Sequence, residues 1–559
     1  MHKVFEYGVI KILSGEERLI DQLFARTRYW NSLVEVERVY QEGKEEALLQ
    51  ASESMAEAQL VVDAAEQGLV NALATQADAR KAARSKRLSS EYAEAVSLAR
   101  AARREAYATF RQVRKDAFGS EDVQARLHEL REQRTAAVRA ARTATDLYWG
   151  TYLDVENNYR AQRVKKGALL RFHRAVPEGA VSVWLLDGGI PTSRIWGDSS
   201  MIQVDPVSEG AWLSPIRGER RRLSRTTARL RVGTTDRTAD YVEVQMVMHR
   251  PLPDDGIIRH ASVVRRRIGT HYRHTLTITV ETADNGAVAH GGPVAAIDVG
   301  WRLFQDRLRV AYMVDDRGNR EEISLPRFLL DELHKTEHIQ SIRDINFNDA
   351  KAVFLVQIPQ LDKPAWWVEA TATLPQWRSA GRLAGLVLRW RHNRFPGDVE
   401  AYDALETWRK RDKHLLEYQA NLRDQLLRQR RERYRVWAVG IARKYGTVVL
   451  EDFVLPSLDK DEQHEAARWL QRVAAIGELR VILGQTCTRE GVVVTKAPAE
   501  YTTQRCHVCE HVNDFDAAAN LSHRCDGCGA EWDQDYNAAR NLLLWHERQG
   551  RSQAVAVPS

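Results

Sequence analysis

Residues 501–510 read YTTQRCHVCE, and residues 523–542 read HRCDGCGAEWDQDYNAARNL. These stretches contain two Cys-x-x-Cys pairs, Cys506 with Cys509 and Cys525 with Cys528, separated by fifteen residues. Four thiolates at this spacing are typical of a tetrahedral zinc site that holds a small ribbon together. Four cysteine ligands leave no coordination position for water, so we expect this zinc to be structural and not to hydrolyse a substrate.

Three acidic residues stand at places where active sites form. Asp298 ends the apolar run 294–297, Glu451 ends the run 448–450, and Asp535 follows Cys528 by seven residues. Strand ends of open α/β sheets are common ligand sites, although Asp298 in a turn or Asp535 as a helix cap is the ordinary alternative. Gathered together, the three carboxylates would repel one another and would need cations. Their oxygens suit Mg²⁺, and two bridged divalent ions support phosphodiester hydrolysis, so we predict a catalytic, magnesium-binding trio.

The length of the chain predicts several domains, and its charge suits a protein that binds a polyanion. The 559 residues are too many for one core, and a net charge of +6 conceals clustered arginines. No apolar run is long enough for a membrane span, and residues 1–13 lack a signal-peptide pattern. Four of five cysteines lie in the paired motif, which indicates a reducing compartment, and Cys487 is expected to be a buried small hydrophobe. We therefore expect a cytoplasmic protein.

Residues 16–163 predict antiparallel helices. The segment is rich in Ala, Glu and Arg and has no proline, and Leu48, Met55, Val62 and Leu69 recur every seven residues. Breaks are expected at 89–90 and 118–120. A helical hairpin with solvated charges and a positively charged arm both remain open, because arginines are dense at Arg84, Arg87, Arg100, Arg103, Arg104, Arg111 and Arg114.

The next segments predict a β domain and an α/β core. Short β-branched runs between 167 and 289 indicate a barrel or sandwich, which the strand expected at 4–12 completes across the helical insertion. From 293 onward, strands alternate with helices, including a long basic helix over 412–445 and helices over 465–483 and from 537. The tryptophans of this part, Trp366, Trp367, Trp377 and Trp390, are expected to pack in the core.

The order AIDVGW, VLEDF, YTTQRCHVCE and HRCDGCGAEWDQDYNAARNL resembles the split RuvC-like nuclease core with zinc ribbon of TnpB transposon proteins and type V CRISPR effectors. More narrowly, DLYWGTY at 146–152, LLRFHR at 169–174 and IDVGWR at 297–302 resemble the V-M subtype of miniature effectors. The resemblance extends over essentially the whole chain and is firmest after residue 293.

The resemblance implies a multidomain α+β fold in six segments. Residues 1–15 would be the first strand of a wedge β domain, 16–165 a helical, coiled recognition lobe, and 166–290 the β-barrel wedge. The RuvC-like, RNase H-fold α/β nuclease core would occupy 291–498, with the zinc ribbon at 499–531 inserted before the third motif and C-terminal helix at 532–559.

The resemblance also implies a partner set and a function. The protein would be a monomeric ribonucleoprotein with a CRISPR guide RNA, acting in antiviral defence on double-stranded target DNA. It would be a prokaryotic, nucleoid-associated protein of the cytoplasm. It would recognise a short, T-rich adjacent motif, form an R-loop, and need no separate tracrRNA. Residues expected to contact nucleic acid are Arg171, Arg174, Arg220, Arg221, Arg222, Arg265, Arg266, Arg267, Arg428, Arg431, Arg435, Gln504 and Arg505.

Three functional hypotheses remain open at this point. V-M effectors are associated with target binding that silences transcription without cutting, whereas this chain retains all three acids. We expect Mg²⁺-dependent cleavage of target DNA or of precursor guide RNA, with silencing by binding as the alternative and a TnpB-type nuclease as a second one. Trp301 and Arg302 follow Asp298 closely, and either is expected to obstruct a DNA strand or compete with a cation.

Overall fold

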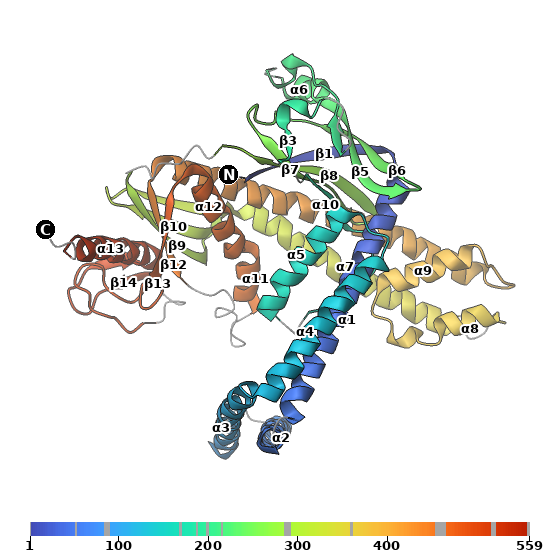
Figure 1. Cartoon of the computed structure of the whole chain (residues 1–559). Coiled ribbons are helices and arrows are strands. Elements are labelled where there is room, and N and C mark those ends of the chain that lie inside the picture. Colours follow the sequence, from blue (N-terminus) through green and yellow to red (C-terminus); the bar gives the residue numbers. More distant parts are fainter. Residues whose placement is uncertain are drawn as a thin grey trace. The chain divides into compact units, whose positions relative to one another are not determined.

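The structure is a computed structural model that describes residues 2–50, 53–82, 90–166, 170–185, 188–196, 201–213, 216–283, 292–357, 362–452, 465–515 and 521–555. The chain divides into two compact units (Figure 1). The N-terminal unit contains His2–Arg266 and Arg273–Thr282, and the C-terminal unit contains Arg267–Tyr272 and Ala283–Ser559. Each unit has its own sheet and its own hydrophobic core.

The N-terminal unit is built on an eight-stranded sheet in the order β2-β7-β8-β1-β6-β5-β4, with β3 paired to β7. Its strands are β1 (His2–Ser14), β2 (Gly179–Trp184), β3 (Ile190–Pro191), β4 (Ile202–Val204), β5 (Arg225–Thr235), β6 (Thr238–Val247), β7 (Ile257–Ile268) and β8 (His271–Glu281). The N-terminal strand β1 lies between β8 and β6, and so completes the sheet across the helical insertion. Within the described residues, β2 and β4 form the two edges of the path, and the closed barrel stays a prediction.

In the described part of the chain, five helices interrupt this sheet between β1 and β2. They are α1 (Glu16–Gln50), α2 (Glu53–Ala82), α3 (Ser90–Phe118), α4 (Glu121–Thr143) and α5 (Trp149–Lys166). The break predicted at 118–120 is confirmed, since Ser120 caps α4 by accepting a hydrogen bond from the Val123 amide at 3.4 Å. The break at 89–90 adjoins residues 83–89, which lie outside the described residues, as do Arg84 and Arg87.

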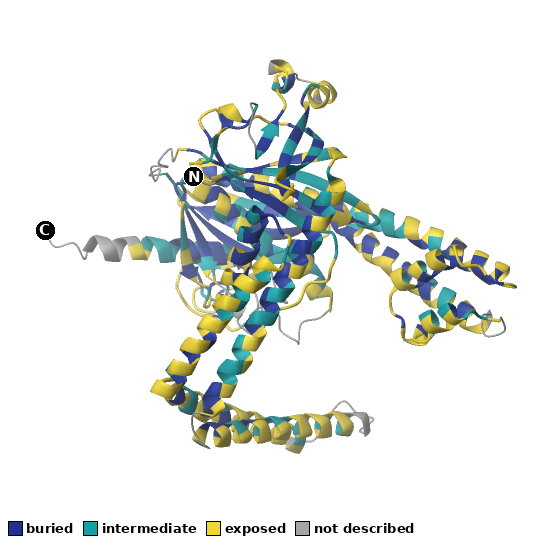
Figure 2. Cartoon of the chain, turned by 45° about the vertical axis from the view of Figure 1, so that its right-hand side comes forward, coloured by how far each residue is buried: buried dark blue, intermediate teal, exposed yellow. Residues whose placement is uncertain are grey.

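The heptad stripe predicted in this insertion is largely buried. Leu48, Met55 and Val62 form part of one core cluster, whereas Leu69 is only half-buried. Figure 2 shows that α2 and α3 expose most of their remaining surface. A further break at 144–148 separates α5, which was not predicted from the sequence.

The C-terminal unit contains a five-stranded sheet in the order β11-β10-β9-β12-β13. Its strands are β9 (Val294–Leu303), β10 (Arg307–Asp315), β11 (Arg320–Pro326), β12 (Thr447–Asp452) and β13 (Val493–Pro498). β12 runs parallel to both β9 and β13, whereas β10 and β11 are antiparallel, so the predicted α/β core is mixed. Strand β11, in which three of seven residues are charged, was not predicted from the sequence.

Helices cover both faces of this second sheet. The long helices of this unit are α7 (Arg327–Gln357), α10 (Val399–Lys444), α12 (Ile476–Glu490) and α13 (Gln534–Val555), and the short ones are α8 (Ala365–Thr371), α9 (Ala380–Arg391) and α11 (Glu465–Ala474). Of these, α8 and α9 pack with α7 and α10 in a separate helical cluster and not on the sheet. Because strand side chains alternate, Ile297 and Val299 of β9 face the core that α10 and α12 share, whereas Ala296 faces Leu542 and Leu543 of α13.

Other helix predictions needed correction. The single helix predicted over 465–483 is broken at Ala475, whose φ of 44° lies in the left-handed region. The last helix begins at Gln534, so Asp535 lies in its first turn and not before it.

The packing role predicted for the tryptophans is confirmed for Trp367, Trp377 and Trp390, which are buried in one cluster. In the described part of the chain, no helix has the length and apolarity that a bilayer crossing requires.

Candidate functional site

The acidic residues predicted from the sequence meet on the α13 face of the second sheet. Leu450 pairs in parallel register with Ile297, so Glu451 and Asp298, which follow them, lie at the same level of adjacent strands. Glu451 lies near the end of β12, as predicted, whereas Asp298 lies inside β9 and not at its end. Because side chains alternate along a strand, Asp298 and Glu451 point to the same face of the sheet as Ala296 and Val449, which pack against α13. Asp535 reaches the same place from the first turn of α13. The fold therefore unites residues from three distant segments.

Burial and mutual repulsion dominate the electrostatics of these three carboxyl groups. Burial raises the pKa of Asp298 well above its usual range, and the charges of Asp535 and Glu451 raise it further. Burial also raises the pKa of Glu451, against a hydrogen bond from Thr502, and that of Asp535, against the charge of Arg309. Carboxylates in such surroundings carry unbalanced negative charge, which a bound cation would offset.

The donor set fits a hydrated Mg²⁺ ion better than a closed metal cage. Among the residues that the structure describes, the ribbon cysteines are the only group of three or more His, Cys, Asp or Glu side chains whose ligand atoms all lie within 4.8 Å of one another. The acidic trio is therefore more open than that group. Mg²⁺ commonly keeps several waters and uses one or two carboxylates, which suits this arrangement.

Two basic residues face the acidic site from β9 and β10. Arg302 of β9 donates from its NH2 group to Gln534 Oε1 at 3.3 Å, and its charge opposes the rise in the pKa of Asp535. Trp301, by contrast, packs against the hydrophobic core on the opposite face, so its predicted role as an obstruction is wrong. The second basic residue is Arg309 of β10, whose Nε lies 2.8 Å from Asp535 Oδ2. It was not singled out from the sequence.

The four cysteines form two matching turns. Cys506 Sγ lies 3.7 Å from Cys528 Sγ, and Cys509 Sγ lies 3.5 Å from Cys525 Sγ. The amides of Val508 and Gly527 donate to the sulfurs of Cys506 and Cys525, each at 3.4 Å. Sulfurs of a tetrahedral zinc site with bonds of about 2.3 Å would be roughly 3.8 Å apart. The residues therefore fit a structural zinc ion.

The cysteine turns connect to the acidic site through one loop. Asn541 donates to the carbonyl oxygens of Thr502 and Arg505 at 2.8 and 2.7 Å, and Asn537 donates to those of Thr503 and Arg505 at 3.0 and 2.7 Å. The Thr502 hydroxyl then donates to Glu451 Oε1 at 2.9 Å. The asparagines of the NAARN segment thus fix the loop that orients Glu451, a role that was not predicted from the sequence.

The predicted nucleic-acid residues of the C-terminal unit are partly engaged with acidic neighbours. Arg428 contacts Asp424 at 3.1 Å, Arg431 contacts Glu478 at 2.7 Å, and Arg435 lies 3.9 Å from Glu432. All three side chains are nevertheless 46–57% exposed, so each retains surface toward solvent. Gln504 and Arg505 are half-buried beside the first cysteine turn, and Arg267 is exposed.

The N-terminal unit contains the other predicted contacts. Arg171 and Arg174 are exposed, as is Arg266, and α6 (Arg217–Leu223) exposes Arg220, Arg221 and Arg222. Arg265 departs from the prediction, because it is only 6% exposed and donates to the Pro177 carbonyl oxygen at 2.8 Å. Its guanidinium stabilises the β domain and is not presented to a phosphate.

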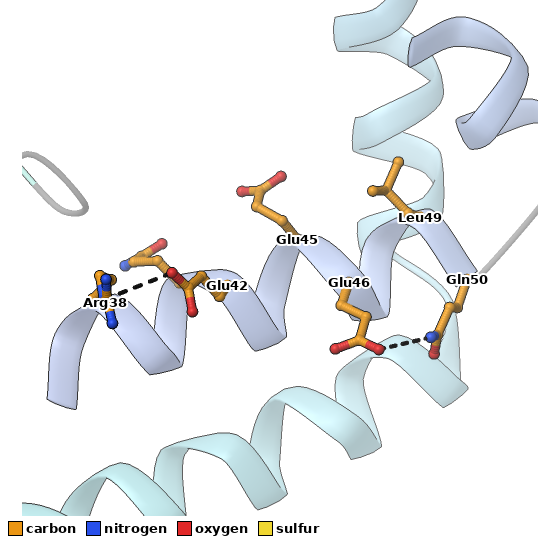
Figure 3. Close-up of a pocket in the computed structure, with 7 residues that line it drawn as sticks. Arg38, Glu42, Glu45, Glu46, Leu49 and Gln50 are labelled. Atoms are coloured by element: carbon orange, nitrogen blue, oxygen red, sulfur yellow. Dashed lines mark hydrogen bonds and ion pairs between the residues drawn. The ribbon is translucent and has the colours of Figure 1, made fainter. Parts of the chain in front are cut away.

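A groove along α1 has the opposite charge (Figure 3). Its volume is about 690 Å³, and it is lined by Arg38, Gln41, Glu42, Glu45, Glu46, Leu49 and Gln50. Arg38 points toward Glu42, with 3.7 Å between Nε and Oε1. Three glutamates line the groove, and Arg38 and Arg114 pair with two of them, so the groove keeps a net negative charge and is unsuited to a phosphate backbone. The positively charged arm that remained open for the helical insertion therefore does not extend to this part of α1.

Comparisons with known proteins bear on the whole chain. Residues 477–542 match the family described as Cas12f1-like, TNB domain. The chain is 41% identical over 438 residues to the CRISPR-associated DNA-binding protein Cas12m of Thermanaerosceptrum fracticalcis, covering 76% of this chain and 74% of that protein. It is 34% identical over 553 residues to the protein of the same name from Allomeiothermus silvanus, covering 97% and 96%. A cryo-EM structure of a Cas12f1–sgRNA–target DNA complex covers 97% of this chain and 98% of its own, with 12% identity and a TM-score of 0.38, which supports no conclusion about function.

Proposed function

Because the chain belongs to the Cas12m family of type V CRISPR effectors, we propose that it binds double-stranded DNA under the direction of a guide RNA. The observation that carries this proposal is its 34% identity, over 97% of its length, to a relative named as a DNA-binding protein. The guide would read the target sequence by base pairing, while the protein would hold the heteroduplex by its backbone and read a short, T-rich adjacent motif. The TnpB-type alternative loses its support with this family membership.

The exposed arginines supply the surfaces that such binding needs. Arg220, Arg221 and Arg222 project from one short helix, and Arg171 and Arg174 lie on another exposed segment of the same unit. Phosphate contacts of this kind add affinity without reading sequence, which is the role that guide-directed recognition leaves to the protein. The zinc ribbon and the six-segment domain organisation belong to the same proposal.

A second candidate function is Mg²⁺-dependent cleavage in the RuvC-like site, either of target DNA or of precursor guide RNA. The observation in its favour is that Asp298 and Glu451 lie at one level of adjacent strands while Asp535 approaches from α13. When bound, divalent cations would stabilise the attacking and leaving oxygens of a phosphodiester. The Cas12m relatives are named for DNA binding, so cleavage ranks second.

One assay separates the two candidates. The purified chain is combined with a guide RNA and incubated with duplex DNA that matches the guide or carries mismatches next to the adjacent motif. We expect a mobility shift with matched DNA only, in the presence of guide. Binding that ignores the guide would overturn the proposal.

The same reactions with Mg²⁺ then test cleavage. Intact DNA under saturated binding supports the binder, whereas strand scission that Asp298→Ala abolishes supports the second candidate. Glu400→Ala, at an exposed carboxylate on α10, is the matched control and should behave as wild type.

A further inference from the structure

Arg309 is a buried cation inside the acidic site. Its side chain is only 5% exposed, and its Nε lies 2.8 Å from Asp535 Oδ2. One terminal nitrogen donates to Asp533 Oδ2 at 2.9 Å, and the other lies 3.4 Å from Glu322 Oε2. A single guanidinium therefore contacts three carboxylates, which belong to three separate elements.

A β-bulge brings this arginine to the acidic face. The register of β10 shifts between Arg309 and Ala311 against both neighbouring strands, and Val310 and Ala311 both pack into the opposite core. Arg309 and Tyr312 are consequently turned toward α13, where Tyr312 meets Tyr536. The bulge thus serves to place a fixed positive charge beside Asp535.

We propose that the guanidinium of Arg309 neutralises Asp535 in place of a metal ion. The acidic site would then bind one divalent ion, at Asp298 and Glu451, and would exclude a second one. This inference rests on the proposed RuvC-like site. A divalent ion bonded to Asp535 Oδ2 would lie within a few ångströms of the guanidinium, where like charges in a poorly hydrated site repel strongly. Two-ion catalysis needs ions about 3.5–4 Å apart that share carboxylates, and Arg309 holds one of those carboxylates already.

Two interpretations of the same geometry predict opposite results. If Arg309 competes with a cation, its removal frees Asp535 and strengthens cation binding. If it only orients Asp535 for a metal ion, its removal weakens cation binding. A titration of Mn²⁺, a spectroscopically visible substitute for Mg²⁺, distinguishes them without any nuclease activity.

The variants are Arg309→Gln, which removes the charge, and Arg309→Lys, which keeps the charge but loses the planar fork that spans Asp533 and Asp535. Arg327→Gln is the matched control, because Arg327 is half-exposed at the start of α7 and its Nε lies 2.9 Å from Asp331, which is not one of the three carboxylates beside Arg309. Bound Mn²⁺ is measured by electron paramagnetic resonance on the full chain with its guide RNA, and the same preparations are tested for DNA binding.

For Arg309→Gln we expect more Mn²⁺ per chain than for wild type, and binding tighter by about tenfold, with a smaller gain for Arg309→Lys. Arg327→Gln should match wild type. Weaker or unchanged Mn²⁺ binding in either folded Arg309 variant would overturn the inference. Loss of guide-directed DNA binding by the wild-type chain would instead refute the proposed function, while leaving the Mn²⁺ comparison intact.

Discussion

At the scale of single residues, Asp298 carries the largest electrostatic strain in the candidate site. It is 8% exposed, and burial is the main cause that raises its pKa. The negative charges of Asp535 and Glu451 raise this pKa further. A carboxyl group with a higher pKa in the folded than in the unfolded chain binds more protons when folded. The folded state therefore loses stability as the pH rises from the pKa of an aspartate in the unfolded chain to the raised pKa of folded Asp298, unless a cation is bound.

This reasoning predicts that Asp298→Asn stabilises the metal-free protein. In EDTA at pH 8, we expect the melting midpoint of the C-terminal unit to rise by about 2 °C, because roughly 1 kcal/mol shifts the midpoint by about 2–4 °C in domains of 150–250 residues and by less in larger units. The difference should vanish below about pH 4, where an unfolded aspartate is also protonated. Differential scanning calorimetry measures it, with the exposed Asp306→Asn as control. A lower midpoint at pH 8 would contradict the prediction.

Thr502 supports a second prediction at this scale. Its hydroxyl donates to Glu451 at 2.9 Å and lowers the pKa of that carboxyl group. In Thr502→Val, Glu451 loses both its orientation and part of its acidity, so Mn²⁺ should bind about fivefold more weakly, the effect of a hydrogen bond that contributes roughly 1 kcal/mol. Thr503→Val is the control, because Thr503 offers its carbonyl oxygen to Asn537. Equal Mn²⁺ affinity in both variants would show that Thr502 does not position Glu451.

At the scale of elements, the two cysteine turns act as a support for the acidic site. The first turn is joined to α13 through His507, whose amide donates to Asn537 Oδ1 at 3.0 Å. Asn537 and Asn541 in turn hold the loop that contains Thr502. Disruption of the cysteine turns should therefore alter the orientation of the Glu451 side chain without any change in the sheet itself.

We predict that Cys528→Ser loses the zinc ion and loosens this support. Wild-type protein should contain about one zinc per chain by elemental mass spectrometry, whereas the variant should contain almost none. Amide hydrogen exchange should accelerate across the 501–513 loop but not in β9. Cys487→Ser is the control: Cys487 is fully buried elsewhere, and burial raises its pKa to about 11, so it should leave the zinc content unchanged. A Cys528→Ser protein with full zinc would contradict the proposed ligand set.

Elements also show where sequence reasoning reached its limit. Asp298 and Glu451 were found from a general rule, that carboxylates after apolar strands mark ligand sites in α/β sheets, although β9 continues past Asp298 to Leu303. Arg309 escapes that rule: a strict alternation along LRVAYMV would place it with Ala311 and Met313, and the bulge that separates them leaves no mark in the sequence. Likewise, Arg265 resembles Arg266 in the sequence, and only strand packing reveals that it is buried.

At the scale of the whole molecule, charge is divided between surfaces of opposite sign. The arginines of α6 are exposed, whereas the α1 groove is lined by glutamates. A net charge of +6 therefore understates the positive potential that a polyanion would meet near α6. Guide-directed DNA binding should consequently depend strongly on salt.

We predict that replacing Arg220, Arg221 and Arg222 together by alanine weakens DNA binding equally for all matched targets. The slope of log affinity against log salt concentration should fall by about 0.9 for each phosphate that the variant no longer neutralises. Binding titrations between roughly 50 and 200 mM salt, where such effects are large, provide the measurement. Arg38→Ala, within the acidic groove, should leave the slope unchanged. A triple variant with the wild-type slope would remove α6 from the DNA-binding surface.

The central position of β1 governs how the nascent chain can mature. This strand is translated before its partners β6 and β8, which follow it by more than two hundred residues. At roughly 5–20 residues per second it must wait on the order of tens of seconds with both edges unpaired. Chaperone dependence during synthesis, and a yield that rises when translation of the helical insertion is accelerated by codon choice, are the consequences of this topology.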